Sequence, residues 1–404
     1  MAFDTFSGIE YLQIDIANHM GLDKALWNER IAWVESHEDH LESLVNTADE
    51  PALYFAAVQA YRDVQANKPI GYTISLDATS SGLQLLAVLT GDTLAASLCN
   101  VIDTGNREDA YTGVYTEMVR RIGGKAKISR DQTKDAIMTS LYGSTAMPKL
   151  VFGDGPLLDI FYSTMEDMAP GAWELNKMFL ALWNPDAYSN DWILPDNFHV
   201  QVKVMGKTKE VVHFLDKPYD IYTKVNEPQE TGRSLGANTI HSIDGMVVRE
   251  MTRRCGFDPL KVKQIKDLLF SGYYPVTPKE KLDEDDLMVQ QLTSHAQQSG
   301  FLSARILDHL NESNIYLCNT TDVETLIESL PAKPFWVLSV HDCFRCLPHY
   351  GNDLRRQYNT ILMEIARSEL LSFIISQLVG RLVPVSKLDP DLWKKVADTN
   401  YALS

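Results

Sequence analysis

Two strand-like segments, each ending at an aspartate, constrain the fold of this chain more than any other feature. Residues 71–76 alternate as a strand does and lead into Asp77, while residues 335–340 form an apolar run of strand length that leads into Asp342. We predict two buried strands lying side by side, so that carboxylates from distant parts of the chain meet over one site. Two aspartates suffice to hold the two divalent cations, about 4 Å apart, that phosphoryl transfer to a hydroxyl requires.

A single aspartate at the end of a strand is usually a cap or a turn residue, so neither segment alone predicts an enzyme. A helix predicted to begin at Arg130 changes this interpretation. At steps of four residues, one face of it carries Arg130, Lys134, Met138 and Tyr142. Two cations, an apolar side chain and an aromatic ring suit the phosphates and the base of an incoming nucleotide. Without the aspartates, the helix would be interpreted as a solvated helix with a basic pair and a buried tyrosine.

Composition limits the classes of protein that remain. The chain has 37 Lys+Arg against 54 Asp+Glu, a formal net charge of -17, which argues against binding nucleic acid by bulk electrostatics. Positive charge is nevertheless concentrated in residues 120–134 and again in residues 249–266, so one cleft can still be basic. The acidic run at residues 283–286 is typical of a solvated loop or a helix start.

Cysteine usage and hydropathy predict the compartment. The five cysteines form no even framework, and the C-x-x-C at Cys343 and Cys346 has no second pair that would complete a zinc site. No apolar stretch reaches the roughly 18 residues that a membrane span needs. The amino terminus lacks a signal pattern. We therefore expect a cytoplasmic protein with reduced cysteines and no membrane contact.

Three segments, in this order, resemble the A, B and C motifs of the single-subunit RNA polymerases of phages and mitochondria. They are Asp-x-x-x-x-Gly-x-Gln at 77–84, Arg-x-x-x-Lys-x-x-x-Met-x-x-x-Tyr-Gly at 130–143 and His-Asp-x-Phe at 341–344. Family-like segments also occupy residues 11–39, 51–62 and 236–245. The resemblance implies an α+β, mostly helical, right-hand polymerase fold with an antiparallel palm sheet and fingers.

The resemblance also implies roles for the charged residues of these motifs. Asp77 and Asp342 would bind two Mg²⁺ ions, with the backbone carbonyl of Ala78 as a further ligand. Arg130 and Lys134 would contact the triphosphate of a ribonucleoside triphosphate. Lys134 would in addition protonate the pyrophosphate leaving group. These residues together imply template-dependent nucleotidyl transfer to the RNA 3′ end.

The remaining motif residues would contact the nucleotide and the nucleic acid. Met138, Tyr142 and Gly143 complete the implied nucleotide-binding set, and Tyr142 would select ribose and help to position the template base. His241 and Gly143 would touch the nucleic acid near the growing end; a hydrogen-bonded structural histidine is the alternative for His241. Related DNA polymerases carry a glutamate five residues after the first aspartate, where this chain has Gly82, so we expect the site to accept ribose.

The resemblance divides the chain into palm, fingers and palm. We expect a first palm segment at residues 1–93 and fingers at residues 94–241, including a β-hairpin at residues 198–222 with its turn near Gly206. The second palm segment would span residues 242–404 and end in a carboxy-terminal foot. An insertion at about residues 257–334 departs from the simpler family members, and its role is left open.

Parts of the family pattern are missing from this sequence. The first motif begins after only 76 residues, and neither a thumb nor an Asp-x-x-Gly-Arg segment is present. Without a thumb, few backbone contacts would resist loss of the RNA and DNA hybrid. We therefore expect a second polymerase subunit that supplies the thumb and the rest of the palm, as in the split, two-chain RNA polymerase of a phage. The other expected partners are a DNA template, the RNA product, ribonucleoside triphosphates and a single-stranded-DNA-binding or promoter factor.

Two other functions stay open on the sequence alone. The first is a family A DNA polymerase fragment or a primase-like enzyme, which would differ in the sugar of the nucleotides that it adds. The second is a non-catalytic nucleic-acid-binding subunit, which the missing thumb favours. Such a subunit would keep its function after Asp342→Ala, whereas an enzyme would lose nearly all nucleotide addition.

Overall fold

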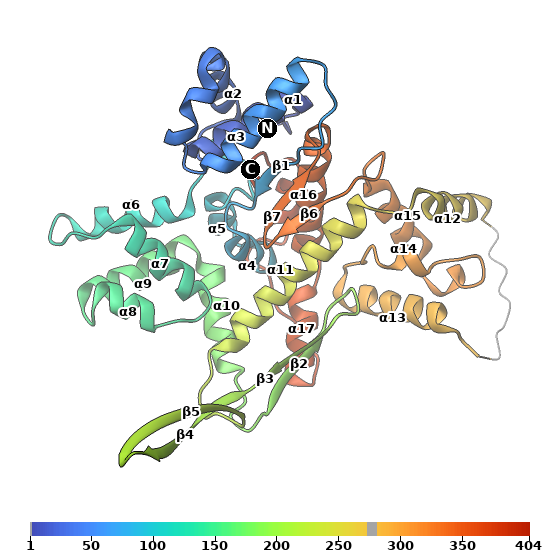
Figure 1. The fold of residues 1–404 in the computed structure, drawn as a ribbon. Helices are drawn as coiled ribbons and strands as arrows, with labels where there is room; N and C mark the ends of the chain where they lie inside the picture. The colour runs from blue at the N-terminus through green and yellow to red at the C-terminus, as the bar shows by residue number, and fades with distance from the viewer. Residues whose placement is uncertain (1, 273–280) are drawn as a thin grey trace.

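The computed structural model describes residues 2–272 and 281–404 of the chain. Helices dominate it, and the strands among these residues form three small antiparallel sheets, as the α+β prediction requires. Figure 1 shows a central body of helices and a short sheet, with helical groups on both sides and a long hairpin below. None of the described helices is both long and apolar enough to cross a membrane.

The first helices form a lobe at one end of the molecule. Its elements are α1 (Gly8–Ala17), the short π-helix η1 (Asn18–Leu22), α2 (Trp27–Ser36), the 3-10 segment η2 (Glu38–Thr47) and α3 (Pro51–Gln65). The Ser7 hydroxyl accepts a hydrogen bond from the Glu10 backbone N–H, and the Ser7 backbone N–H donates to the Glu10 carboxylate. This capping box begins α1. The two ends of the chain meet here, because the Asp4 backbone donates to the Asn400 side chain at 2.7 Å.

The central sheet joins the two aspartate segments. Its strands are β1 (Ile74–Asp77), β7 (Cys343–Cys346) and β6 (Leu338–Val340), in the order β1-β7-β6, and all pairs are antiparallel. Asp77 lies opposite Cys343, the residue after Asp342. Both segments therefore belong to one sheet, but the prediction that their strands lie side by side is wrong, because β7 lies between β1 and β6.

The prediction of two buried strands is wrong for the second segment. Within residues 335–340 only the last three form a strand, and Trp336 and Val340 are exposed. The reason is that β6 is the edge of the sheet, and its partner β7, which begins after Asp342, occupies the centre between β6 and β1. The apolar character of this run therefore reflects an uncovered edge.

Helices pack behind this sheet and form the main apolar core. In α4 (Ser81–Thr90) every residue after Ser81 is buried, which explains its continuous run of apolar residues. The long helix α11 (Ser234–Cys255) and α16 (Gly351–Arg367) contact α4 from either side. The last helices are α17 (Leu370–Val379) and the short 3-10 turns η4 (Pro348–Tyr350) and η5 (Leu392–Lys395).

A group of helices extends to one side of the core (Figure 1). They are α5 (Thr93–Leu98), α6 (Ala110–Ile122), α7 (Arg130–Leu141), α8 (Ala146–Phe152), α9 (Pro156–Met168) and α10 (Pro170–Ala181). Asp109 caps α6, and Ser129 caps α7 by accepting from the Gln132 backbone. The helix predicted from Arg130 is thus present with the predicted start.

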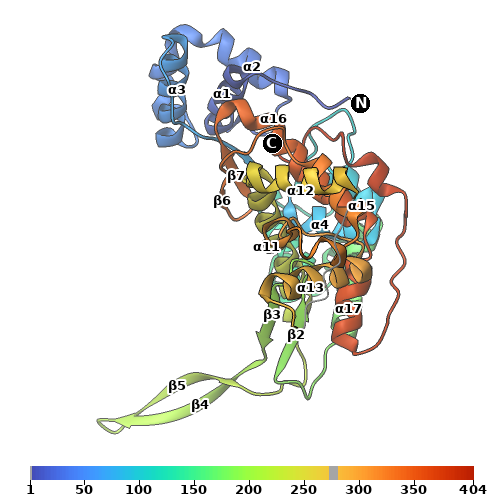
Figure 2. The same cartoon turned by 90° about the vertical axis from the view of Figure 1, so that its right-hand side faces the viewer.

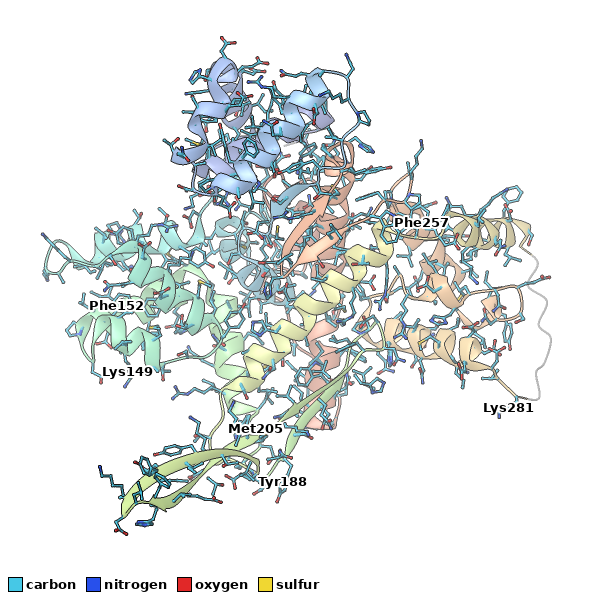
Figure 3. All side chains as sticks on the ribbon, viewed as in Figure 1. Lys149, Phe152, Tyr188, Met205, Phe257 and Lys281 are labelled. Carbon is cyan, nitrogen blue, oxygen red and sulfur yellow. The ribbon has the colours of Figure 1, made fainter. Side chains whose placement is uncertain are left out.

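The predicted hairpin is present, but its boundaries are wrong. A first pair joins β2 (Ser189–Ile193) to β3 (His199–Lys203), and a second joins β4 (Met205–Phe214) to β5 (Lys217–Asn226). The tight turn lies at Leu215 and Asp216, both with positive φ, and Gly206 is inside a strand. Beyond Met205 the side chains of β4 and β5 stand clear of the body (Figures 2 and 3).

The segment predicted as an insertion forms its own small core. It contains α12 (Pro259–Ser271), α13 (Glu284–Ser299), α14 (Ile306–His309), the turn η3 (Ile315–Leu317) and α15 (Thr320–Ser329). Its buried apolar residues form a cluster distinct from the main core. Asp283 caps α13, so the acidic run is a helix start, as predicted. Residues 273–280 of the predicted insertion lie outside the described residues.

Candidate active site

A polar cleft of about 500 Å³ lies where the amino-terminal lobe, the central sheet and helices α6 and α7 meet. Its walls include Asp77 and Ser75 of β1, Cys343 and Arg345 of β7 and the chain end at Ser404. Basic residues of the cleft are Lys24, Arg107, Arg130, Lys134 and Arg345, and acidic ones are Asp23, Asp49, Glu50, Asp77 and Asp109. Its volume is typical of a small-molecule site.

Strand pairing positions the two predicted metal-binding aspartates. Asp77 ends β1, and Asp342 lies in the tight turn between β6 and β7, after His341 with its positive φ of 57°. The Ala78 backbone N–H donates to the Asp342 carbonyl at 3.2 Å, so a direct main-chain bond joins the two segments. Burial in the cleft and then the charge of Asp342 raise the pKa of Asp77 to about 6.

The carboxy terminus pairs with the other side of β1. The backbones of Asp77 and Ser404 exchange two hydrogen bonds, at 3.3 and 2.9 Å, and Ala78 lies opposite Leu403. Gln84, the last residue of the first motif, is fully buried and donates to the Ala402 carbonyl at 2.8 Å. The Tyr358 hydroxyl in turn donates to Gln84 at 2.7 Å. The glutamine of this motif therefore holds the chain end beside Asp77.

Helix α7 carries two cations into the same cleft. Arg130 forms an ion pair with Asp109 at 2.5 Å, and its Nε donates to the Thr112 hydroxyl at 2.8 Å. The Lys134 ammonium lies 5.4 Å from the centre of the Tyr111 ring and forms no ion pair in the part of the chain that the structure describes. The structure thus brings Asp77, Arg130 and Lys134 together around one cavity.

Tyr142 follows the last turn of α7 and lies close to the first motif. A Cβ atom added at Gly82 would be 2.3 Å from the Tyr142 hydroxyl oxygen, so only glycine leaves room for this ring position. Burial, followed by the charge of Asp244, raises the pKa of Tyr142 to about 12. Its ring lies 4.8 Å from that of His241, which is exposed on α11.

Two other predicted residues lie outside the cleft walls. Met138 is 41% exposed on α7 and does not line the cleft. Gly143 adopts a φ of 82°, a left-handed conformation that favours glycine, and it ends α7 beside the carbonyl of Arg233. Neither residue contacts the paired strands, so the predicted nucleotide-binding set is spread over α7 and not gathered in one pocket.

Sequence reasoning missed three charged or polar residues of this region. Arg107 and Tyr111 line the cleft, and Asp244 lies one helical turn after His241. Burial and the charge of Asp342 raise the pKa of Asp244 to about 6. The single available signal was the position of Asp244 inside a family-like segment. Arg107 lies in an irregular segment that gives no periodic pattern.

The donor atoms of the aspartate pair suit Mg²⁺. This ion prefers oxygen ligands, keeps several waters and binds through one or two carboxylates together with substrate phosphates. Asp77 and Asp342 supply two carboxylates, and the Ala78 carbonyl accepts no hydrogen bond from the described residues. Among the described residues, no three His, Cys, Asp or Glu side chains lie close enough together to form a metal site by themselves. Burial and, after it, repulsion from Asp342 raise the pKa of Asp77, and a bound cation would offset both effects.

Comparisons with known proteins agree with the motifs. A model of the DNA-dependent RNA polymerase family matches residues 5–150, which include Asp77, Arg130 and Gly143. The DNA-directed RNA polymerase of Pseudomonas phage phiKMV is 23% identical over 326 residues, covering 64% of this chain and 40% of that protein. A probable DNA-directed RNA polymerase of Agaricus bitorquis is 23% identical over 371 residues, covering 84% of this chain and 30% of that protein.

A mitochondrial relative extends the comparison. The mitochondrial DNA-directed RNA polymerase of Neurospora crassa is 28% identical over 166 residues, covering 34% of this chain and 12% of that protein. The chain therefore spans less than half the length of these relatives. Its three motifs occur in family order, and two of them meet in one cleft. Over these segments the chain is similar to the single-subunit DNA-dependent RNA polymerases of phages and mitochondria.

Proposed function

We propose that this chain is the catalytic subunit of a DNA-directed RNA polymerase that adds ribonucleotides to an RNA 3′ end on a DNA template. The observation that carries the proposal is the single cleft in which Asp77, beside Asp342, shares its walls with Arg130 and Lys134. Acids that hold cations and bases that hold phosphates are the two requirements of phosphoryl transfer. The chain would act on phage genes in the cytoplasm of the infected host.

The acidic side of the cleft would hold magnesium. Asp77, Asp342 and the Ala78 carbonyl would be the ligands. Two bound Mg²⁺ ions would supply positive charge to the attacking 3′ oxygen and to the leaving pyrophosphate. The backbone bond between Ala78 and Asp342 holds the backbones of the two aspartate segments next to each other.

The basic side of the cleft would hold the triphosphate. The ion pair with Asp109 and the bond to Thr112 fix the Arg130 side chain, and its Nη1, which has only a long contact of 3.7 Å with Asp131, would turn to phosphate oxygens. Lys134 has no ion pair among the described residues, so its ammonium is available to donate to the phosphates and to give a proton to the departing pyrophosphate. A helix that begins at Arg130 also directs its N-terminal N–H groups towards anions near that end.

Residues around Tyr142 would choose and position the sugar and the template base. Gly82 stands where related DNA polymerases carry a glutamate. The Tyr142 hydroxyl occupies the space next to Gly82 that a side chain at this position would need. Without a bulky group at this position a ribose 2′-hydroxyl meets no obstruction, which supports ribonucleotides as substrates. The adjacent ring of His241 would contact the nucleic acid near the growing end. Met138 and Gly143 would border the nucleotide on α7.

The architecture proposed on this basis has a palm at residues 1–93 and 242–404 and fingers at residues 94–241. A second subunit would supply the thumb and the rest of the palm. The edge strand β6, with its exposed Val340, offers an unpaired edge close to Asp342 where such a subunit would add a strand.

A primer-extension assay tests the proposed function. The chain, with any chains that co-purify, is given a preformed RNA and DNA hybrid, Mg²⁺ and either ribonucleotides or deoxynucleotides. Extension with ribonucleotides is expected, and it should disappear in Asp342→Ala while Asp267→Asn, which alters an exposed carboxylate on α12, retains it. Extension with deoxynucleotides alone would indicate a DNA polymerase. Hybrid binding that survives Asp342→Ala, with no extension by the unaltered protein, would indicate a binding subunit.

A further inference from the structure

We propose that Arg107, which lies outside the three motifs, is a further binding residue for the triphosphate of the incoming nucleotide. This inference rests on the proposed function and adds a residue to its substrate site. Arg107 lies between α5 and α6, at the junction of two clefts. It lines the cleft of Asp77 and Lys134 and also a second cleft of about 770 Å³ along α6.

The backbone around Arg107 is firmly held. The Asn100 side chain accepts from the Glu108 N–H at 2.7 Å and donates to the Glu108 carbonyl at 2.9 Å. Asp109 then caps α6 and binds Arg130. The residues on the carboxyl side of Arg107 are thus attached both to the segment after motif A and to the start of α7. The Cα of Arg107 is therefore held between α5 and α6.

The guanidinium of Arg107 has few partners for a group so enclosed. Its Nη1 donates to the Glu108 carbonyl at 3.0 Å, while its Nε is buried and has no acceptor. No described carboxylate lies within the 4.0 Å of an ion pair. Burial lowers its pKa, although the charges of Asp23, Asp109 and Asp77 oppose this effect. An enclosed guanidinium normally satisfies more of its five donors, so an anion is the missing partner.

Two other buried arginines show what a structural role requires. Arg30 donates to the carbonyls of Ala25 and Asp23 and to the Asn18 side chain, at 2.6 to 3.0 Å. Arg254 forms ion pairs with Glu250 and Glu364. Arg107 has neither a set of carbonyls nor a carboxylate at bonding distance. Arg345 and Arg355 also have a buried Nε without an acceptor; Arg345 lines the same cleft from β7, and Arg355 donates its other N–H groups to the carbonyls of Asp4 and Asn400.

The chemistry of the cleft favours a triphosphate as the anion. Arg107 is two residues from Asp109, the partner of Arg130, so it extends the basic group of α7 towards the second cleft. A guanidinium matches phosphate oxygens with two parallel N–H donors. A cavity of about 500 Å³ has room for a nucleotide and not for a duplex. Together with Arg130 and Lys134, Arg107 would offset most of the charge of the triphosphate that Mg²⁺ leaves.

Equilibrium binding tests the proposal without any turnover. The full chain, with any co-purifying chains, is titrated with inorganic tripolyphosphate in the presence of Mg²⁺ by calorimetry. Arg107→Met removes the charge and keeps the stem, and we expect the affinity to fall roughly 10- to 100-fold, as for a lost charge-assisted hydrogen bond. Arg120→Met is the matched control, because this arginine of α6 is exposed, pairs with Glu117 and lines neither cleft. Arg107→Lys should restore part of the affinity.

Each result separates this proposal from its rivals. Equal affinities of Arg107→Met and the unaltered protein would overturn it, as would equal losses in Arg107→Met and Arg120→Met. A loss confined to the binding of the RNA and DNA hybrid would assign Arg107 to the nucleic-acid backbone and overturn it too. If Arg107→Met does not fold, Arg107→Lys decides: an unchanged affinity and an unchanged KM for ribonucleotides would count against a geometric role for the guanidinium.

The proposed function and this inference can fail independently. Tripolyphosphate binding that depends on Arg107, in a protein that extends no primer, would remove the polymerase proposal and keep the anion site. If the protein extends the primer and Arg107→Met has the same KM for ribonucleotides as the unaltered protein, the polymerase proposal stands and the anion site at Arg107 is refuted. The supporting result is an increase in KM with a smaller change in kcat, because a contact present before the transition state chiefly affects binding.

Discussion

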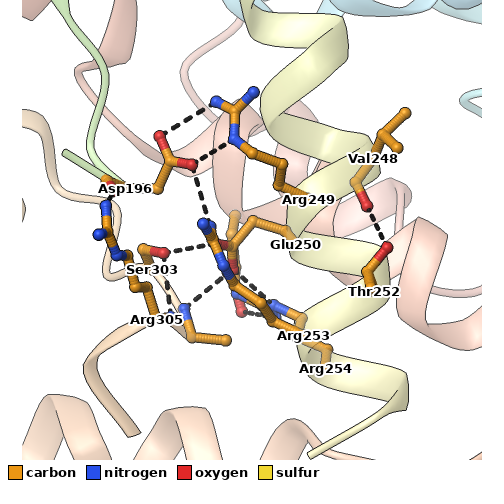
Figure 4. Close-up of polar contacts among 11 residues, drawn as sticks. Asp196, Val248, Arg249, Glu250, Thr252, Arg253, Arg254, Ser303 and Arg305 are labelled. Carbon is orange, nitrogen blue, oxygen red and sulfur yellow. Dashed lines mark hydrogen bonds and ion pairs between the residues drawn. The ribbon is translucent and has the colours of Figure 1, made fainter. Parts of the chain in front are cut away.

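Two groups of charged side chains in this molecule differ in how completely they are paired. In the first, around Asp196, buried acids and arginines of α11 satisfy one another (Figure 4). Asp196 forms ion pairs with Arg249 at 2.6 Å and with Arg253 at 2.9 Å. In the second, the cleft beside β1, Asp77, Lys134 and Arg107 have no ion pair among the described residues. The paired charges join segments of the chain to one another, whereas the unpaired charges of the cleft are free to bind a ligand.

The paired group has a clear structural task. Glu250 of α11 binds Arg253, the Ser303 hydroxyl and the Ala304 backbone N–H, and the last two belong to the inserted segment. Arg305 donates to the Asp196 carbonyl at 3.0 Å. This network therefore attaches the insertion and the β2–β3 connection to α11. In the cleft, by contrast, burial and then repulsion from Asp342 raise the pKa of Asp77, so the ionised carboxylate lowers the stability of the fold there.

The largest effect is expected from Asp77→Asn. If the cleft charges serve a ligand, removing one should reduce primer extension by about a thousandfold, or about 4 kcal/mol of transition-state stabilisation. Unfolding by urea should show no loss of stability, because the carboxylate opposes Asp342 in the absence of metal. Asp267→Asn serves as the control for both measurements. A strong loss of stability with proportionate loss of activity would mean that Asp77 is a structural residue.

Glu250→Gln should have the opposite outcome. The substitution removes one buried counter-charge that Arg253 and Arg254 share, although Asp196 and Glu364 remain beside them, and breaking a buried pair typically costs about 3 kcal/mol of unfolding free energy. Specific activity of the folded fraction should stay near that of the unaltered protein, since Glu250 lines neither cleft. Glu117→Gln, which breaks ion pairs on the surface of α6, is the comparison variant and should change stability little. If the two variants are equally stable, the Asp196 network is no more important than a surface pair.

Features set by local patterns could be predicted from the sequence. The alternation before Asp77 and the four-residue spacing from Arg130 depend on neighbours in the chain, and β1 and α7 lie where these patterns place them. The pairing of β1 with β7 could not be read in the same way. The four residues of β7, which follow Asp342, are too few for a periodic signal, so the sequence favours the longer apolar run of residues 335–340 as the buried partner.

Features that depend on distant partners escaped prediction for a physical reason. Gly206 suggests a turn, yet it lies in β4. A glycine is required at this position of the strand because the Glu227 side chain leaves no room for a Cβ atom. The real turn uses Leu215, a residue type that rarely adopts positive φ. Arg107 is significant because acceptors are missing around it, and a sequence does not show which groups surround a side chain. The unpaired charges of the cleft were therefore visible only in three dimensions.

Gly82→Ala tests how tightly the cleft's neighbour Tyr142 is positioned. The new Cβ would lie 2.3 Å from the Tyr142 hydroxyl, so the ring must move. We expect kcat/KM for ribonucleotides to fall about tenfold, which is about 1.4 kcal/mol. Gly71→Ala is the control, because nothing lies within 4 Å of a Cβ at that exposed position. An unchanged kcat/KM in Gly82→Ala would show that the ring position seen here is not the one used in the reaction.

The smallest effect is a dependence of stability on pH that follows from the unpaired acids. The pKa values of Asp77 and Asp244 are raised from 3.8 to about 6, so between these values the folded chain binds more protons than the unfolded one. In the absence of Mg²⁺ this contribution to stability is fully present below about pH 4 and is lost as the pH rises through about 6. Urea unfolding in a metal chelator at pH 5, 6 and 7 measures it. The slope should flatten in Asp77→Asn, and Mg²⁺ should oppose it because the ion binds the ionised carboxylates. An identical slope in both proteins would show that burial and repulsion from Asp342 do not raise the pKa of Asp77, and the cleft would then lack the property that separates it from the Asp196 network.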